Sequence, residues 1–146
     1  MIQTERLFNN QEIWQNKLKI LIVEDNLINQ KIIQKIITKA GFGCSIASNG
    51  KEALKALEND DYDIVLMDIQ MPEMDGIEAT RIIRNPASNV KNHAIPIIAM
   101  TAHAMKGDRE MCIAAGMNDY ASKPIQPQEL FKKLEKQISL NNKTIE

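Results

Sequence analysis

Short apolar runs alternate along the chain with longer segments in which apolar residues recur at helical spacing. The apolar runs are KILIV at 19–23, GCSIA at 43–47, YDIVLMD at 62–68, IPIIAM at 95–100 and DYAS at 119–122. Each has the length of a β-strand, and each is followed by a segment whose pattern is typical of an amphipathic helix. The sequence therefore predicts five consecutive strand–helix pairs.

The predicted helices are recognised by the apolar residues that each would turn inward. The first should bury one face and end at Gly41, because a glycine favours helix termination. Its buried face is expected to consist of Ile28, Ile32, Ile33, Ile36 and Ile37. The other four helices are expected around the inward-facing Ala53, Leu54 and Leu57, around Ile77 to Ile83, from Met105 to Ala115, and around the aligned Leu130, Leu134 and Ile138.

Strands that are apolar on both sides and alternate with helices are typical of a parallel sheet covered on two faces. A chain of 146 residues matches the size of one domain. We therefore expect an α/β fold with a doubly wound, five-stranded parallel sheet, (βα)₅, over residues 18–138. Residues 1–17 would form an N-terminal extension, for which a linker, a disordered arm and an extra helix remain open, and residues 139–146 a C-terminal tail.

The charge balance and the cysteines exclude several classes of protein. Lysine and arginine number 18 against 19 acids, so the net charge of −1 gives no broad basic field for nucleic acid or an anionic membrane. The apolar runs are too short to span a bilayer, and the first residues lack the apolar core of a signal peptide, so we expect a cytoplasmic protein. Cys44 and Cys112 lack the spacing of a metal or redox pair and are expected in the core.

Polar residues that could bind a ligand or take part in a reaction stand at the ends of four predicted strands. Asp68 ends the third strand, Glu24 and Asp25 follow the first, Thr101 follows the fourth and Lys123 follows the fifth. In open parallel sheets, ligands bind beyond the carboxyl ends of the strands, near the point where the strand order reverses. These side chains are therefore expected to meet in one crevice.

A cluster of three carboxylates predicts a bound cation, because the like charges repel one another. Magnesium suits such a site, since it prefers oxygen ligands and needs few of them from the protein. Asp68 could then attack a phosphoryl group and form an acyl phosphate. Lys123 would offer a compact positive charge to the phosphoryl oxygens, and the Thr101 hydroxyl could donate a hydrogen bond to one of them.

Four motifs carry a family resemblance: LIVEDN at 21–26, VLMDIQMPEMDG at 65–76, IIAMTAHA at 97–104 and YASKPI at 120–125. In this order and spacing, they make the chain from about Leu18 to Ile138 resemble a response-regulator receiver domain of two-component signalling. The amino-acid sequences of these motifs are most similar to those of receivers in hybrid histidine kinases. The resemblance implies a flavodoxin-like arrangement of the predicted sheet.

The resemblance also implies a role for each motif residue. Asp68 would be the phosphoacceptor, and Thr101 and Lys123 would contact the phosphoryl group. Magnesium would be bound by Glu24, Asp25, Asp68 and the backbone carbonyl of Gln70. Tyr120 would be an aromatic switch that turns with phosphorylation, although a packed core aromatic is the alternative, and the Lys123–Pro124 bond would be cis.

The implied function is that of a phosphoacceptor module, which catalyses only its own phosphorylation and dephosphorylation. The phosphoryl group would come from phosphohistidine on a histidine kinase or a histidine phosphotransfer protein, and the changed surface would bind a downstream effector protein. No direct contact with nucleic acid and no membrane insertion is expected. Two alternatives remain: a pseudo-receiver that binds a partner without phosphorylation, and a magnesium-dependent phosphatase with an aspartate nucleophile. A haloacid-dehalogenase-type phosphatase would require D-x-D-x-[TV], whereas IQMP follows Asp68.

Overall fold

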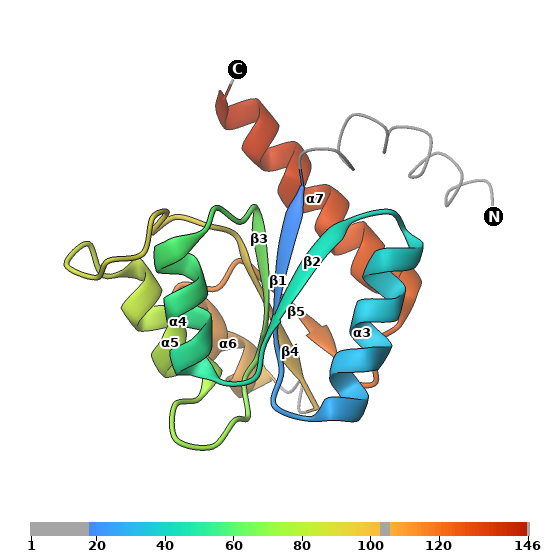
Figure 1. Ribbon diagram of the computed structural model, residues 1–146, viewed down its shortest axis with the longest axis horizontal. Coiled ribbons are helices and arrows are strands. Elements are labelled where there is room, and N and C mark those ends of the chain that lie inside the picture. The colour runs from blue at the N-terminus through green and yellow to red at the C-terminus, as the bar shows by residue number, and fades with distance from the viewer. Residues whose placement is uncertain (1–17, 103–105, 146) are drawn as a thin grey trace.

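The computed structural model describes residues 18–102 and 106–145, so the expectation for residues 1–17 lies outside the described part. Five parallel strands form one sheet in the order β2-β1-β3-β4-β5, which is the flavodoxin-like order (Figure 1). The strands are β1 (Lys19–Val23), β2 (Gly43–Ala47), β3 (Ile64–Asp68), β4 (Ile97–Thr101) and β5 (Asp119–Ser122). The expected fold class is confirmed.

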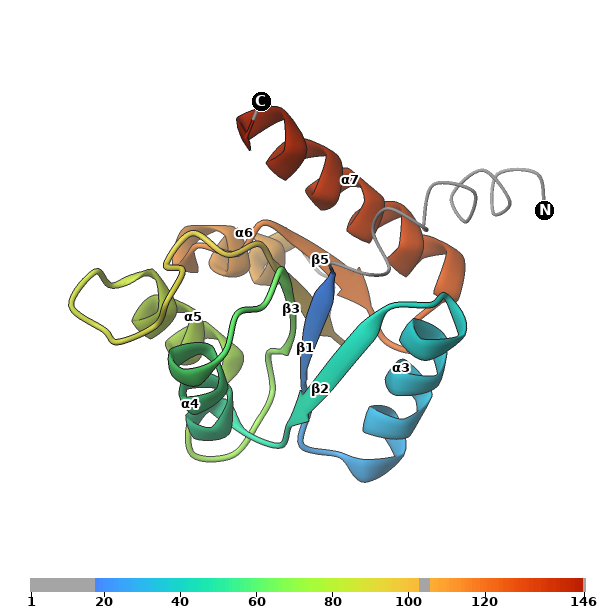
Figure 2. The same cartoon turned by 45° about the horizontal axis from the view of Figure 1, so that its top comes forward.

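A helix follows each strand, and the helices cover both faces of the sheet. The helices are α3 (Leu27–Lys39), α4 (Gly50–Asn59), α5 (Gly76–Arg84), α6 (Lys106–Ala115) and α7 (Pro127–Ile145). Helices α3 and α7 lie on one face of the sheet, and α4, α5 and α6 lie on the other (Figures 1 and 2). None of the described helices combines the length and the apolar character that a membrane span requires.

The alternation of side chains along the strands gives each face its own core. Leu21, Val65 and Ile97 face α4, α5 and α6, where they pack with residues such as Leu57 and Ile83. Their strand neighbours face the other way and pack with α3 and α7; this second core includes Ile20, Ile22, Leu66, Ile98, Ile33, Ile37, Leu130 and Leu134. Strands buried on both sides contain few polar residues until their carboxyl ends, which is where the polar cluster begins.

Helix α3 does not bury the face that the apolar spacing indicated. Ile33 and Ile37 are buried as expected, but Ile28 and Ile32 are 70% and 48% exposed. Gln30 takes part in the buried face instead. The apolar stripe is wider than the contact with the sheet, so counting apolar residues could not identify which edge of the stripe faces solvent.

The last helix is longer than expected. The apolar pattern predicted its end near Ile138, whereas α7 continues to Ile145 and extends beyond the sheet (Figure 2). The residues after Ile138 include neither glycine nor proline, so no strong local signal stops the helix. Among the cysteines, Cys112 is buried as expected, while Cys44 is half-buried.

The loop between β3 and α5 is held close to the strand end by Gly76. The Gly76 amide donates a 3.0 Å hydrogen bond to the Ile69 carbonyl, which closes the loop. A Cβ on Gly76 would lie 2.3 Å from the Asp68 carbonyl oxygen and 3.0 Å from Ile69 Cα, both backbone atoms that cannot turn aside. Asp75 caps the helix, since its Oδ1 accepts the Glu78 amide at 2.8 Å.

We predict that Gly76→Ala destabilises the protein by about 1 to 3 kcal/mol, because the added methyl group overlaps fixed backbone atoms. Gly107→Ala is the matched control, since a Cβ there meets nothing within 4 Å and alanine favours a helix. The free energies of unfolding from urea titrations would measure both changes. Equal stability of the two variants would contradict the close approach at Gly76.

Candidate functional site

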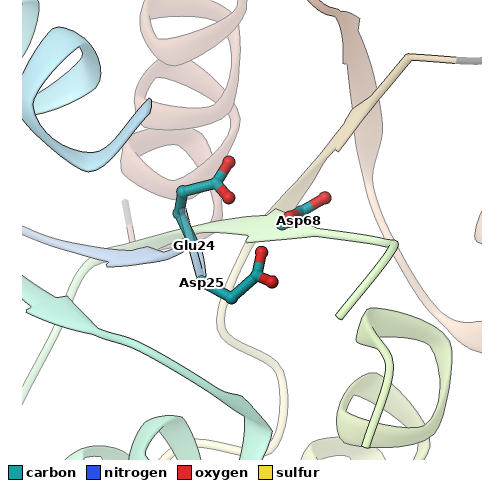
Figure 3. A group of neighbouring side chains, drawn as sticks. All are labelled: Glu24, Asp25 and Asp68. Carbon is teal, nitrogen blue, oxygen red and sulfur yellow. The ribbon is translucent and has the colours of Figure 1, made fainter. Parts of the chain in front are cut away.

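The sheet brings the acids of the first and third strands to its centre. Strands β1 and β3 are neighbours, and the strand order reverses between them. Glu24 and Asp25 follow the last residue of β1, and Asp68 is the last residue of β3. The expected meeting of these residues is confirmed: one carboxylate oxygen from each of the three lies within 4.8 Å of the other two (Figure 3).

Glu24 is a fully buried carboxylate with a fixed orientation. It is 0% exposed, and its Oε2 accepts the Asn26 amide at 3.1 Å. Its Oε1 lies 2.9 Å from Lys123 Nζ. Among the residues that the structure describes, no hydrogen-bond donor of good geometry reaches that same Oε1. Glu24 is therefore charge-paired but keeps an oxygen with unused acceptor capacity.

Asp68 is held by two contacts to the same oxygen. It is 2% exposed, and its Oδ1 lies 3.0 Å from Lys123 Nζ. The Gln70 amide donates to this Oδ1 at 3.2 Å. Lys123 thus bridges Glu24 and Asp68, and one ammonium group is shared between two buried carboxylates.

This arrangement makes the ionised form of Asp68 unfavourable. Burial is the largest effect and, together with repulsion from Glu24, raises the pKa of Asp68 from 3.8 to about 7, although Lys123 partly offsets both. Burial alone would lower the pKa of Lys123, but its close contacts with the charged carboxylates of Glu24 and Asp68 outweigh that effect and raise its pKa. The lysine is therefore cationic while Asp68 is close to its protonation midpoint at neutral pH.

The carboxylates fit a divalent metal ion. Three acids from two strand ends direct oxygen ligands to one place, and Asp25 is exposed beside the two buried acids (Figure 3). Glu24 Oε1 is a buried acceptor without a well-placed hydrogen bond, which a cation or its bound water would satisfy. One lysine cannot balance three carboxylates, and oxygen-only ligands suit a hard ion.

The other expected site residues lie on β4, on β5 and in the loops that follow β3 and β5. Thr101 ends β4 and is 4% exposed, and its carbonyl accepts the Lys123 amide at 2.8 Å. The Lys123–Pro124 peptide bond is cis, as the resemblance implied. Gln70 stands in the loop after Asp68, where its backbone amide donates to Asp68 Oδ1. Tyr120 is half-buried in β5 and packs against the core beneath α4, α5 and α6.

Gln30 is a site residue that the sequence did not reveal. Its Nε2 donates to the Glu24 carbonyl at 2.6 Å and to Ser48 Oγ at 3.2 Å, so it fixes the backbone of the acid pair against the start of α4. A polar residue three positions before Ile33 and seven before Ile37 lies on the same helical face as these buried side chains. That spacing was the available signal, but a glutamine on a helix is usually solvated.

The comparisons with known proteins agree on one family. The profile of the response regulator receiver domain matches residues 20–135. Hybrid signal transduction histidine kinase I of Dictyostelium discoideum is 48% identical over 125 residues, which cover 82% of this chain and 7% of the kinase. The sensor histidine kinase GacS of Pseudomonas protegens is 38% identical over 112 residues, covering 77% of this chain and 12% of the kinase. The chain thus spans a small part of these relatives.

Two solved structures have the same fold, one with a bound magnesium ion and one in complex with another protein. The receiver domain of a sensor histidine kinase from Pseudomonas aeruginosa, with magnesium coordinated in its active-site cleft, has a TM-score of 0.75, 41% identity, and coverage of 84% of this chain and 98% of that one. A receiver domain from Saccharomyces cerevisiae, crystallised with its histidine phosphotransfer signaling protein, has a TM-score of 0.73, 33% identity, and coverage of 80% and 86%.

We predict that Asp68→Asn stabilises the metal-free protein increasingly as pH rises. The raised pKa means that folded Asp68 retains a proton between about pH 4 and about pH 7, whereas the unfolded chain releases it. This group's contribution to stability therefore falls as pH rises through that window and stays low above it. Asparagine cannot ionise, so it avoids the cost of a buried negative charge. The free energy of unfolding should therefore rise by a few kcal/mol above about pH 7, since each pKa unit corresponds to about 1.4 kcal/mol.

Urea titrations in the presence of a chelator would measure this gain across the window. Asp61→Asn is the control, because that side chain is 91% exposed and its loss should change stability little at any pH. A gain for Asp68→Asn that stayed constant with pH would show that burial of the carboxylate does not penalise its charge.

Proposed function

This chain belongs to the response regulator receiver domain family, and from that membership we propose that it accepts a phosphoryl group from phosphohistidine on Asp68. The observation that carries the proposal is the shared Lys123: its ammonium lies 2.9 Å from Glu24 and 3.0 Å from Asp68, at the carboxyl ends of the central strands. A buried carboxylate beside a fixed cation is suited to attack a group that carries negative charge.

The transfer exchanges one bond for another. An Asp68 carboxylate oxygen bonds to phosphorus while the bond from phosphorus to the donor's imidazole nitrogen breaks, and the electron pair returns to that nitrogen. Lys123 then places its positive charge beside the phosphoryl oxygens, and the Thr101 hydroxyl donates a hydrogen bond to one of them. Asp68 acts in its ionised form, which makes the charge of Lys123 necessary at neutral pH.

The acids of the site would hold magnesium. We assign Glu24, Asp25, Asp68 and the backbone carbonyl of Gln70 as the residues that would bind it. When bound, the ion neutralises negative charge on the carboxylates and on the incoming phosphoryl group. The carboxylate cluster supports this assignment, as does the magnesium in the cleft of the related Pseudomonas aeruginosa receiver.

The cellular setting proposed here is a two-component phosphorelay in the cytoplasm. The donor would be a histidine kinase or a histidine phosphotransfer protein, and the next component an effector protein that prefers the phosphorylated surface. We propose no direct contact with nucleic acid, no membrane insertion and no turnover of other substrates. The receiver unit would comprise residues 18–138, and the similarity to hybrid histidine kinases supports a place within such a kinase.

An apolar surface beside the site fits a protein donor. Among the described residues, Leu27, Ile28 and Ile32 on α3 are large apolar side chains that are 69%, 70% and 48% exposed. A groove of about 330 Å³ runs from Glu24 and Lys123 to Ile32 and Ile125, so this surface is continuous with the site. We propose that the phosphohistidine protein docks here, because its histidine must come within bonding distance of Asp68.

The alternatives differ in what they require of these residues. A pseudo-receiver would not need the acceptor, the acids and the lysine together. Here Lys123 contacts Glu24 and Asp68, and Asp25 lies within 4.8 Å of these two acids. A phosphatase with an aspartate nucleophile would need a second carboxylate two residues after Asp68, where Gln70 stands. Labelling of Asp68 distinguishes the receiver from a pseudo-receiver, and the absence of multiple-turnover phosphate release from a phosphate monoester distinguishes it from the phosphatase, which would also form an aspartyl phosphate.

We predict that acetyl phosphate with magnesium adds one phosphoryl group to the protein and none to Asp68→Ala. Asp25→Ala should lose most of the labelling, since the site then lacks a direct metal ligand. Intact-mass spectrometry measures the added group, and omission of magnesium provides the metal-free comparison. Equal labelling of the wild type and Asp68→Ala would overturn the assignment.

We predict that Ile32→Asp slows phosphoryl transfer from a phosphohistidine protein by about tenfold or more, because a charge in an apolar contact opposes docking. Leu140→Asp is the matched control, since both side chains are 48% exposed and Leu140 lies on α7 away from the groove. Transfer from acetyl phosphate should stay unchanged in both variants. A similar loss in both would place the docking surface elsewhere.

A further inference from the structure

The Tyr120 ring is contacted by cations from two helices. Arg109 Cζ of α6 lies 4.9 Å from the ring centroid, and Lys133 Nζ of α7 lies 4.8 Å from it. Both distances are within the range of an attractive cation–π contact. The ring is only half-buried, and it belongs to β5, the edge strand that runs between these two helices.

Lys133 is fixed in this place by a second contact. Its Nζ lies 3.2 Å from Asp119 Oδ1, and both side chains are largely shielded from solvent, at 21% and 15% exposure. The same Oδ1 accepts the Tyr120 amide at 2.8 Å. Asp119 therefore ties the lysine to the backbone of the residue whose ring the lysine covers.

The strand register links this ring to the site. Tyr120 lies opposite Ala99 on β4, and the last pair of that ladder joins Thr101 to Ser122, the residue before Lys123. Ala99 is a small neighbour within the core that the ring also contacts. A ring that turned toward the core would leave Arg109 and Lys133 without their aromatic contact.

We propose that Arg109 and Lys133 form a cationic clamp that holds Tyr120 between α6 and α7 and sets the fraction of unphosphorylated molecules in which the ring is turned inward. The proposal rests on the proposed receiver function and on the role of switch aromatic that the family resemblance implies for Tyr120. It adds that the resting position is set by two side chains outside the phosphorylation site. A phosphoryl group then competes against this clamp.

Fluorine NMR of protein labelled with fluorotyrosine tests the clamp without any phosphoryl group. The chain has two tyrosines, so Tyr62→Phe assigns the remaining resonance to Tyr120. The difference in shift between H₂O and D₂O reports the exposure of that ring to solvent. In Arg109→Gln with Lys133→Gln, we expect about a tenfold larger inward population, a moved Tyr120 resonance and a smaller solvent effect, since each contact contributes modestly.

The chain contains a matched control for the loss of a cation. Lys19 Nζ lies 4.7 Å from the centroid of Tyr62, at the opposite end of the sheet from the site. Lys19→Gln should move the Tyr62 resonance and leave Tyr120 unchanged. Arg109→Lys keeps a cation over the ring and should restore most of the wild-type Tyr120 shift, which a loss of packing alone would not predict.

A Tyr120 resonance and solvent effect that match the wild type in the double variant would overturn the clamp. Equal effects of Arg109→Lys and Arg109→Gln would overturn it as well, because the charge would then be irrelevant. Neither measurement uses acetyl phosphate or magnesium. Failure of Asp68 to accept a phosphoryl group would therefore appear in the mass spectra and not in these spectra.

Discussion

One ammonium group shared by two buried carboxylates governs the site. Glu24 and Asp68 are almost fully buried, and each would carry an uncompensated charge without Lys123. The lysine reaches them because its backbone amide is bound to the Thr101 carbonyl, where β5 pairs with β4. The site therefore requires the first, third, fourth and fifth strands together, and no local segment could build it alone.

Because Lys123 is shared between two carboxylates, the site has less positive than negative charge. Burial and the charge of Glu24 raise the pKa of Asp68, since one lysine only partly offsets them, and Glu24 keeps an oxygen that is not fully used. A protein selected only for stability would remove such a cluster, since unpaired buried charge is costly. A transient partner of opposite charge, or a reaction that needs a poised carboxylate, explains why the cost is retained.

The sequence predicted the parts of this arrangement that depend on regular structure. Apolar runs followed by helical spacing predicted a parallel sheet, and Glu24, Asp25 and Asp68 met because strand ends in such a sheet are neighbours. The exposed edge of α3 was predicted wrongly, since Ile28 and Ile32 are as apolar as the buried Ile33. Gln30, Arg109 and Lys133 could not be identified, because their partners are distant in sequence and their spacing resembles that of solvated side chains.

The hydrogen-bonded ladder at the carboxyl ends of the strands limits how the protein can move. The Ile69 amide is bound to the Met100 carbonyl, and the Lys123 amide to the Thr101 carbonyl, so three strand ends are stitched together directly under the site. Sliding of one strand past another would break these bonds along with both cores. The strands therefore resist motion relative to one another, and we expect a change of charge at the site to act through side-chain rotations, which are fast and reversible.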